Sequence, residues 1–145
     1  MSAARAWREE CGIFAAAGVP NAAEVTVLGL HALQHRGQES TGLVTCDDEG
    51  AFHPHKGLGL VADVYRGLDL ARLPGALAIG HDRYSTAGRV TLENTQPLSV
   101  VYRGGSMALA HNGNLVNARM LRERLEGSGS IFQTTLDSEV FLHLI

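Results

Sequence analysis

The chain has 145 residues, of which 45% are hydrophobic and 19% are charged, and its formal net charge at pH 7 is −3. This balance is typical of a compact domain with a buried core, and the scattered basic residues exclude an electrostatic surface for nucleic acid or an anionic membrane. No apolar run approaches the roughly 20 residues of a membrane span, and residues 1–10 lack the apolar core of a secretory signal, so we expect a cytoplasmic protein that acts on a small molecule.

A strand and a helix are predicted first. Residues 11–17, CGIFAAA, are small and apolar without polar alternation, which is typical of a strand buried on both faces. Asn21 and Glu24 have the spacing of a capping box, and apolar residues then recur at helical spacing as far as Gly37. We therefore expect a buried strand followed by a helix.

Two hairpins are predicted in the middle of the chain. Residues 41–46 and 51–56 flank the turn signal DDEG, and Pro54 favours an edge position for the second of these strands. Residues 97–103 and 106–112 are joined by two glycines that tolerate positive φ, which is typical of a tight turn. The Asn-Gly pair that follows is expected to end the last strand.

The remaining elements are a strand over 76–84, between the hairpins, and two later helices. Residues 117–127 carry apolar side chains at helical spacing and end at Gly127, which fits a C′ glycine. A last helix begins near Asp137 and breaks off in the apolar run SEVFLHLI, so we expect a fragment of a longer protein. This order of elements predicts an α+β domain rather than a doubly wound sheet.

Cys11 is one of only two cysteines, and two cysteines in a cytosolic chain are more typical of free thiols than of a disulfide. On residue type alone, Cys11 is a small buried apolar side chain. Its place near the chain start offers another interpretation, because removal of residues 1–10 would expose its own α-amine, whose pKa of about 8 suits a proton acceptor. One residue would then supply both the nucleophile and its base.

Such a nucleophile needs an oxyanion hole, and AHNGNL at 110–115 is the candidate. Asn112 offers a side-chain NH₂, and Gly113 offers a backbone N–H that no side chain shields. Both follow a predicted strand, where loops often expose functional groups. The alternative is an ordinary Asn-Gly turn.

Arg83 and Asp137 are candidates for holding a charged substrate. Arg83 leaves a buried strand, where its planar guanidinium could hold a carboxylate through two hydrogen bonds. A solvated arginine is the alternative. Asp137 could neutralise an ammonium group, although from this residue alone a helix cap is the favoured interpretation.

A metal site is not expected from the seven histidines. His31 and His35 are four residues apart on a predicted helix, but the segment lacks the glutamate of a metalloprotease helix and no third ligand follows from the spacing. His53 and His55 would share one face of an edge strand, where solvated side chains are the simpler interpretation.

Six motifs occur in order along the chain, and together they resemble the glutaminase domain of the glutamine phosphoribosylpyrophosphate amidotransferases. They are CGIF, LQHRGQES, GHDRYSTAG, ENTQPL, AHNGNLVNA and DSEV, and the similarity runs from Cys11 to the end. LQHRGQE and RYSTAG distinguish this family from the aminosugar-forming amidotransferases, which share the N-terminal nucleophile.

The resemblance implies a fold and a set of site residues. Residues 1–10 would be a propeptide whose removal exposes Cys11, and residues 11–145 would form a glutamine amidotransferase type 2 domain. The implied fold is a four-layer αββα sandwich of two antiparallel sheets, incomplete in this chain, in which Cys11 begins a central strand. The implied site consists of Cys11 as nucleophile, Asn112 and Gly113 as the oxyanion hole, Arg83 for the α-carboxylate of glutamine, Asp137 for its α-ammonium, and Tyr84 and Thr86 as pocket residues.

The implied reaction releases ammonia from L-glutamine for the first step of de novo purine biosynthesis. A phosphoribosyltransferase domain, absent from this chain, would use the ammonia to convert phosphoribosyl pyrophosphate to 5-phosphoribosylamine. No metal or other cofactor is expected within this chain, whereas Mg²⁺ and an iron–sulfur cluster are implied for the missing domain, and a homo-oligomer for the full-length enzyme. Two alternatives stay open, namely the glutaminase domain of an aminosugar synthase or similar amidotransferase, and a catalytically silent glutamine-binding module.

Overall fold

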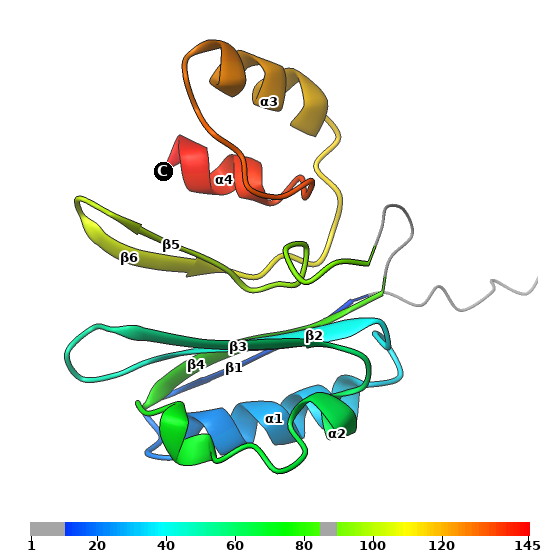
Figure 1. Cartoon of the computed structure of the whole chain (residues 1–145), viewed down its shortest axis with the longest axis vertical. Coiled ribbons are helices and arrows are strands. Elements are labelled where there is room, and N and C mark those ends of the chain that lie inside the picture. Colours follow the sequence, from blue (N-terminus) through cyan, green and yellow to red (C-terminus); the bar gives the residue numbers. More distant parts are fainter. Residues whose placement is uncertain (1–10, 85–89) are drawn as a thin grey trace, which may run out of the picture.

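The computed structural model describes residues 11–84 and 90–145, which form four layers (Figure 1). Helices α1 (Ala22–Leu33) and α2 (Val61–Val64) cover one sheet, a hairpin lies on the other side of that sheet, and α3 (Ala118–Gly127) and α4 (Glu139–Leu144) lie beyond the hairpin. The strands are β1 (Gly12–Ala17), β2 (Ser40–Cys46), β3 (Phe52–Leu58), β4 (Leu77–Arg83), β5 (Leu98–Tyr102) and β6 (Gly105–Leu109), with a 3-10 turn over Leu70–Arg72. The predicted α+β class and the αββα order of layers are confirmed.

The first sheet has the strand order β1-β4-β2-β3, and all its neighbours are antiparallel. β4 lies between β1 and β2, so that Asp82 is opposite Gly12 on one side and Thr41 on the other. The predicted hairpin of β2 and β3 is confirmed, and Pro54 lies on the edge strand β3, where its missing N–H costs no ladder hydrogen bond.

The main hydrophobic core lies between this sheet and the helices α1 and α2. Leu30 of α1, Leu43 of β2 and Val61 of α2 are each at most 1% exposed. The other buried members of this cluster are Ala16, Ala22, Ala23, Tyr65, Leu73 and Ala78. All of them precede β5, so this half of the chain carries the main apolar core.

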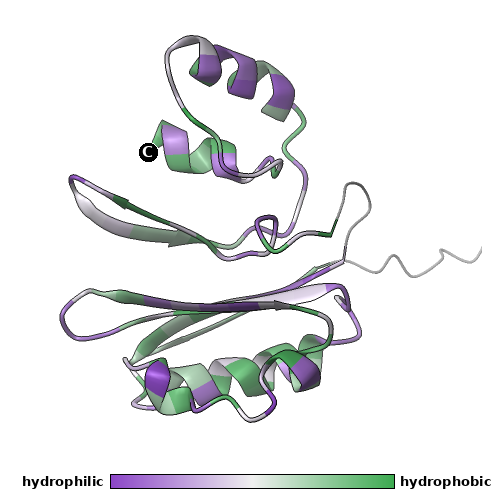
Figure 2. Cartoon of the chain, in the orientation of Figure 1, coloured by the Kyte–Doolittle hydropathy of each residue, from purple (hydrophilic) through white to green (hydrophobic). Residues whose placement is uncertain are grey.

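The second half is more polar. Figure 2 shows α3 as mostly hydrophilic, and α3 has no buried residue. Leu98 of β5 and Val140 of α4 are buried apolar residues of this half. Large apolar side chains remain exposed in this half, such as Val116 at 97% and Val101 at 85%. The layers are in close contact at Gly42, because a Cβ atom there would lie 2.1 Å from the carbonyl oxygen of Gln96. No helix within residues 11–84 and 90–145 has the length and apolar character needed to cross a bilayer.

The first strand differs from its prediction in two respects. Among the strands of residues 11–84 and 90–145, β1 is at the edge of its sheet and not at the centre. It is also not buried on both faces, since Ile13 is 37% exposed and Ala15 and Ala17 are exposed. Glycine and alanine tolerate both environments, so an apolar run built from them does not predict burial.

The ends of three elements also differ from their predictions. Asn21 makes no capping bond to the backbone, because its side chain contacts that of Glu24 instead. β6 ends at Leu109 and not at residue 112, and its turn residues are Arg103 and Gly104. The C′ glycine of α3 is Gly129, with φ of +101°, because the Ser130 N–H donates to the Leu125 carbonyl in a Schellman motif.

Two neighbouring buried residues of β4 have pKa values that are shifted in opposite directions. Asp82 and His81 point to opposite faces of the sheet and are both 0% exposed. Burial raises the pKa of Asp82 to about 7, which the Thr41 hydroxyl opposes in part. Burial, with the Arg83 charge as a second cause, lowers the pKa of His81 to about 4.

Asp82→Asn should stabilise the fold most at high pH. The unfolded carboxyl titrates near about 3.9, so between that pH and the folded value of about 7 the folded state holds an extra proton and stability falls as pH rises. We expect the stability of Asp82→Asn relative to wild type to increase by roughly 2–4 kcal/mol from pH 4 to pH 8, measured by urea denaturation.

The effect of His81 on folding stability has the opposite pH dependence. Its stabilising contribution is complete above about pH 6.5, where the imidazole is neutral in both states, and is lost as pH falls toward 4. It is present in both proteins and cancels in the difference between Asp82→Asn and wild type. Asp48→Asn, at an exposed turn residue, is the control. A difference between Asp82→Asn and wild type that stays constant with pH would contradict an elevated pKa of Asp82.

Candidate active site

Cys11 lies directly before β1, and its thiol is held against the end of β4. The Tyr84 N–H donates to Cys11 Sγ at 3.4 Å, and Sγ lies 3.4 Å from the Tyr84 carbonyl oxygen, which can accept the thiol hydrogen. The Cβ position of Gly12 faces Leu33 of α1, so the alternation of the strand directs the preceding Cys11 to the face between the sheets. The thiol is half-buried, and both cysteines are free.

The carbonyl oxygen of Cys11 receives two side-chain donors. Asn112 Nδ2 donates to it at 2.7 Å, and Arg36 Nε donates to it at 3.2 Å. Asn112, Tyr84 and Arg36 are 101, 73 and 25 positions from Cys11, so segments far apart in the sequence converge on this residue.

Arg36 has no assigned function in the sequence interpretation. Its neighbour Gly37 shows why it reaches Cys11, because a Cβ atom on Gly37 would lie 2.6 Å from the backbone of Asp82. The chain therefore passes close against the end of β4 on its way from α1 to β2. LQHRGQES contains this arginine, but nothing in its spacing predicts the contact with Cys11.

Asn112 and Gly113 lie in an exposed loop after β6. An amide NH₂ has two N–H donors, and the bond to the Cys11 carbonyl uses one of them. The Gly113 N–H makes no hydrogen bond to any residue in the described ranges 11–84 and 90–145. Among the described residues, the second Asn112 N–H and the Gly113 N–H thus have no acceptor, and the Asn112 amide is in contact with Cys11.

Arg83 ends β4 and is only 6% exposed. Its Nη1 donates to the Asn94 carbonyl at 3.0 Å, and no carboxylate in the described part of the chain pairs with it. A nearly buried guanidinium without an anionic partner favours binding of an external anion. The solvated-arginine alternative is wrong. Tyr84 is half-buried beside Arg83, and Thr86 lies outside the described residues.

Asp137 supports the Asn112 loop and does not cap α4 with its side chain. Its Oδ2 accepts a hydrogen bond from the Leu115 N–H at 2.5 Å, so the favoured helix-cap interpretation is wrong. No other hydrogen bond reaches this carboxylate from residues 11–84 or 90–145. Asp137 therefore keeps acceptor capacity beside the loop that carries the donors.

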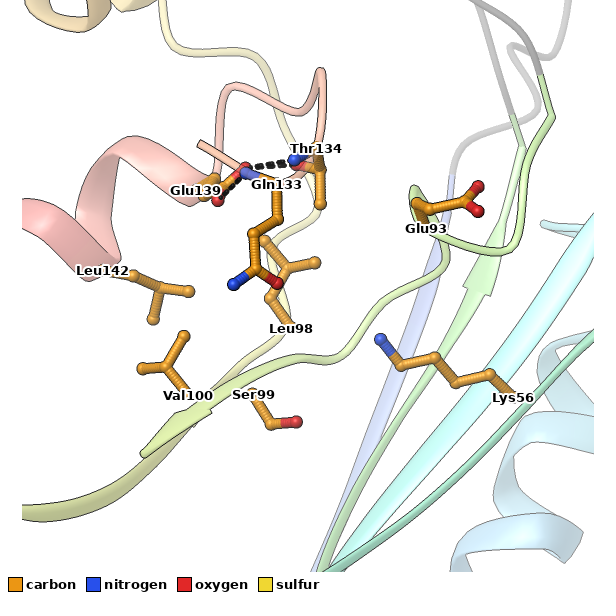
Figure 3. A pocket seen from close by; sticks show the side chains of 9 residues that line it. All are labelled: Lys56, Glu93, Leu98, Ser99, Val100, Gln133, Thr134, Glu139 and Leu142. Carbon is orange, nitrogen blue, oxygen red and sulfur yellow. Dashed lines mark hydrogen bonds between the residues drawn. The ribbon is translucent and has the colours of Figure 1, made fainter. Parts of the chain in front are cut away.

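A cavity of about 200 Å³ lies between β5, the stretch before α4, and Lys56 of β3 (Figure 3). Its lining residues are Lys56, Glu93, Leu98, Ser99, Val100, Gln133, Thr134, Glu139 and Leu142. None of the predicted site residues is among them. Burial lowers the pKa of Lys56, and the carboxylate of Glu139 is already bonded to the loop before α4. This cavity therefore does not extend the predicted site.

The described residues hold no group of three or more His, Cys, Asp or Glu side chains arranged to bind a metal ion. His31 and His35 are both exposed, and α1 ends at Leu33, before the second of them. The predicted four-residue spacing on one helix is therefore not realised.

Comparison with known proteins shows the family of this chain. A family profile described as a glutamine amidotransferase domain matches residues 81–145. The chain is 56% identical over 138 residues to a chloroplastic amidophosphoribosyltransferase of Vigna aconitifolia, covering 95% of this chain and 28% of that protein. It is 54% identical over 138 residues to the amidophosphoribosyltransferase of Lacticaseibacillus casei, covering 94% of this chain and 71% of that protein.

A solved structure is also similar. Glutamine phosphoribosylpyrophosphate amidotransferase from B. subtilis, complexed with ADP and GMP, matches with a TM-score of 0.82 and 48% identity, covering 91% of this chain and 28% of that chain. Two antiparallel sheets between helical layers, with a cysteine at the start of the first strand, define a glutamine amidotransferase domain of the N-terminal-nucleophile class. Within that class, the chain belongs to the amidophosphoribosyltransferase family. It spans little more than a quarter of the first relative's length, 28%.

Glu139→Gln should destabilise the fold. Glu139 is 5% exposed and accepts three hydrogen bonds of 2.7 Å, from the N–H groups of Gln133 and Thr134 and from the Thr134 hydroxyl. An amide NH₂ in place of one oxygen would face these donors, and we expect a loss of about 2–3 kcal/mol by urea denaturation. The matched variant Glu123→Gln, on the exposed face of α3, should leave the unfolding midpoint nearly unchanged. Equal effects of the two variants would contradict this role of Glu139.

Proposed function

We propose that this chain is the glutaminase domain of an amidophosphoribosyltransferase. The observation that carries the proposal is the convergence of Tyr84 and Asn112 on Cys11, with contacts of 3.4 Å to the thiol and 2.7 Å to the carbonyl. The Cys11 thiol and the Asn112 amide belong to one site in this proposal, which supports acyl transfer because that chemistry needs a nucleophile and a nearby hydrogen-bond donor.

Residues 1–10 act in this proposal as a propeptide that is removed to give Cys11 a free α-amine. Within residues 11–84 and 90–145 the thiol contacts the Tyr84 backbone and no separate general base. An α-amine with a pKa of about 8 supplies that base within the same residue.

The α-amine takes the thiol proton, and the thiolate sulfur forms a bond to the side-chain amide carbon of glutamine. The carbonyl electron pair moves to oxygen, and the second N–H of Asn112 together with the Gly113 N–H stabilises that oxyanion. Collapse breaks the C–N bond, and the nitrogen takes the proton from the α-ammonium and leaves as ammonia. Water, deprotonated by the same amine, then hydrolyses the thioester to glutamate and the free thiol.

Arg83 and Asp137 hold the two charged groups of the substrate in this proposal. The nearly buried guanidinium of Arg83 has donors available for the α-carboxylate, and Asp137 has acceptor capacity for the α-ammonium. The resemblance also assigns Tyr84 and Thr86 to this substrate site, and Thr86 lies outside the described residues. Recognition of both charges distinguishes glutamine from a simple amide.

The released ammonia is used by a phosphoribosyltransferase domain, which converts phosphoribosyl pyrophosphate to 5-phosphoribosylamine. The match to enzymes named amidophosphoribosyltransferase supports this acceptor over an aminosugar. Mg²⁺ and an iron–sulfur cluster would belong to that domain, because the described residues of this chain do not fit either group. A cytoplasmic location and a homo-oligomeric full-length enzyme complete the proposal.

The nucleophile is tested by the mature N-terminus and by Cys11→Ser. Mass spectrometry of the intact protein should show a chain that begins at Cys11, and Cys11→Ser should lower glutamate release by at least about 10³-fold, because a hydroxyl is a far weaker nucleophile than a thiolate. An active protein that keeps residues 1–10 would contradict the role of the α-amine. Binding of glutamine without any glutamate formation, despite a free Cys11 amine, would favour the silent binding module.

Arg83→Lys should raise the glutamine KM by roughly 10–100-fold, because an ammonium cannot reproduce a bidentate contact with a carboxylate. The control is Arg103→Lys, at the exposed turn between β5 and β6. Steady-state glutamate release and a thermal melt would be measured for both. If KM stays at the wild-type value while the melt shifts, Arg83 serves only to hold the Asn94 carbonyl.

A further inference from the structure

Residues 94–97 form a buried segment between the two sheets. Asn94, Thr95 and Gln96 are 5%, 0% and 6% exposed. The Gln96 carbonyl lies against Gly42 of β2, where any side chain would displace it. The segment is therefore seated on the first sheet and has little freedom to shift.

The side chain of Gln96 makes two hydrogen bonds with the backbone of one residue. The His111 N–H donates to Gln96 Oε1 at 2.7 Å, and Gln96 Nε2 donates to the His111 carbonyl at 3.2 Å. The His111 carbonyl belongs to the peptide that leads into Asn112. Gln96 thus fixes the peptide plane that sets the direction of the Asn112 side chain.

The side chain of Asn94 makes an analogous pair with Thr135. The Thr135 N–H donates to Asn94 Oδ1 at 3.0 Å, and Asn94 Nδ2 donates to the Thr135 hydroxyl at 2.8 Å. The Asn94 carbonyl also accepts the hydrogen bond from Arg83. Asn94 therefore joins Arg83 to the stretch that leads into Asp137.

Buried amides are retained where both their polar atoms are paired, and here each pair ends next to a different part of the site. We propose that Gln96 is a positioning residue for the oxyanion donors Asn112 and Gly113, and that Asn94 is a positioning residue for Arg83 and Asp137. This inference rests on the proposed glutaminase function, and it adds that two residues of one segment position different parts of the site.

The two roles have different kinetic signatures. Oxyanion donors are used only in the transition state, so a misplaced donor lowers kcat and leaves KM nearly unchanged. The α-carboxylate and α-ammonium are held in both the ground state and the transition state, so misplaced partners raise KM. A general loss of stability would affect kcat and KM in the same way at both positions. It would not lower kcat alone at residue 96 and raise KM alone at residue 94.

The experiment compares Gln96→Met and Asn94→Leu in the intact enzyme, with glutamate release as the readout. Each variant removes an amide and its pair of bonds and keeps an apolar side chain of similar size. We expect Gln96→Met to lower kcat by roughly 10–100-fold with KM within about 3-fold. We expect Asn94→Leu to raise KM by roughly 10-fold or more with kcat within about 3-fold.

Carboxylate variants provide a second, conservative pair. Asn94→Asp can still accept from the Thr135 N–H, and the Thr135 hydroxyl can turn to donate, so KM should return toward wild type. Gln96→Glu still accepts from the His111 N–H but sets an oxygen against the His111 carbonyl, so kcat should stay low. The intact enzyme can also be assayed for 5-phosphoribosylamine synthesis with an ammonium salt in place of glutamine. This assay bypasses the glutaminase site, and its rate should be the same in all four variants as in wild type.

The outcomes separate the two levels of the argument. If wild-type enzyme forms no glutamate from glutamine, the proposed function fails. The positioning roles fail, and the function stands, if wild type is active and both apolar variants change kcat and KM together. The same conclusion follows if neither constant changes in either variant. Loss of a cooperative thermal transition in both Gln96 variants also overturns the positioning role, because Gln96 would then be needed for folding alone.

Discussion

The register of β4 between β1 and β2 is the constraint on which the rest of the site depends. Because side chains alternate along a strand, a slip of β4 by one residue would move Arg83 from the face between the sheets, where Cys11 lies, to the face covered by α1. Gly80 pins the register, since a Cβ atom there would lie 2.7 Å from Leu30 Cδ1 and a slip would place Ile79 or His81 against that side chain. Packing on the helix side of the sheet therefore fixes the chemistry on the other side.

The second half of the site is attached in a different way. No described strand pair joins the β5–β6 hairpin to the first sheet, so their connection is made by side chains and not by a ladder. Arg83 donates to the Asn94 carbonyl and Asn112 donates to the Cys11 carbonyl across the two halves. Within the second half, Asn94, Gln96 and Asp137 bind the backbone of Thr135, His111 and Leu115. A buried hydrogen bond fixes the position and direction of the groups it joins when their polar atoms are paired. This part of the molecule is held by amides and a carboxylate, whereas the core of the first half is held by apolar contacts.

The sequence predicts the elements well where periodicity and turn chemistry act locally. All six strands and the three longer helices α1, α3 and α4 are anticipated, as is the edge position of Pro54. The errors arise where one residue type suits two environments, as with the alanines of β1, or where two glycines compete for one function, as with Gly127 and Gly129 at the end of α3. Motifs bring Cys11, Asn112 and Arg83 to attention, but the contacts of Arg36, Asn94 and Gln96 depend on long-range pairing, for which a single sequence carries no signal.

Under the proposed maturation, the position of Cys11 at a chain terminus explains why two side chains bind its carbonyl. A residue inside a chain is oriented by a peptide bond on each side, whereas under the proposed maturation Cys11 keeps only the bond to Gly12. Side-chain torsions about single bonds are free to exchange between rotamers unless neighbouring groups hold them. The Asn112 and Arg36 bonds to the carbonyl and the Tyr84 contact with the thiol replace the lost constraint. In the proposed reaction, the Asn112 amide that holds the Cys11 carbonyl also donates its second N–H to the oxyanion, so orientation and charge stabilisation depend on a single side chain.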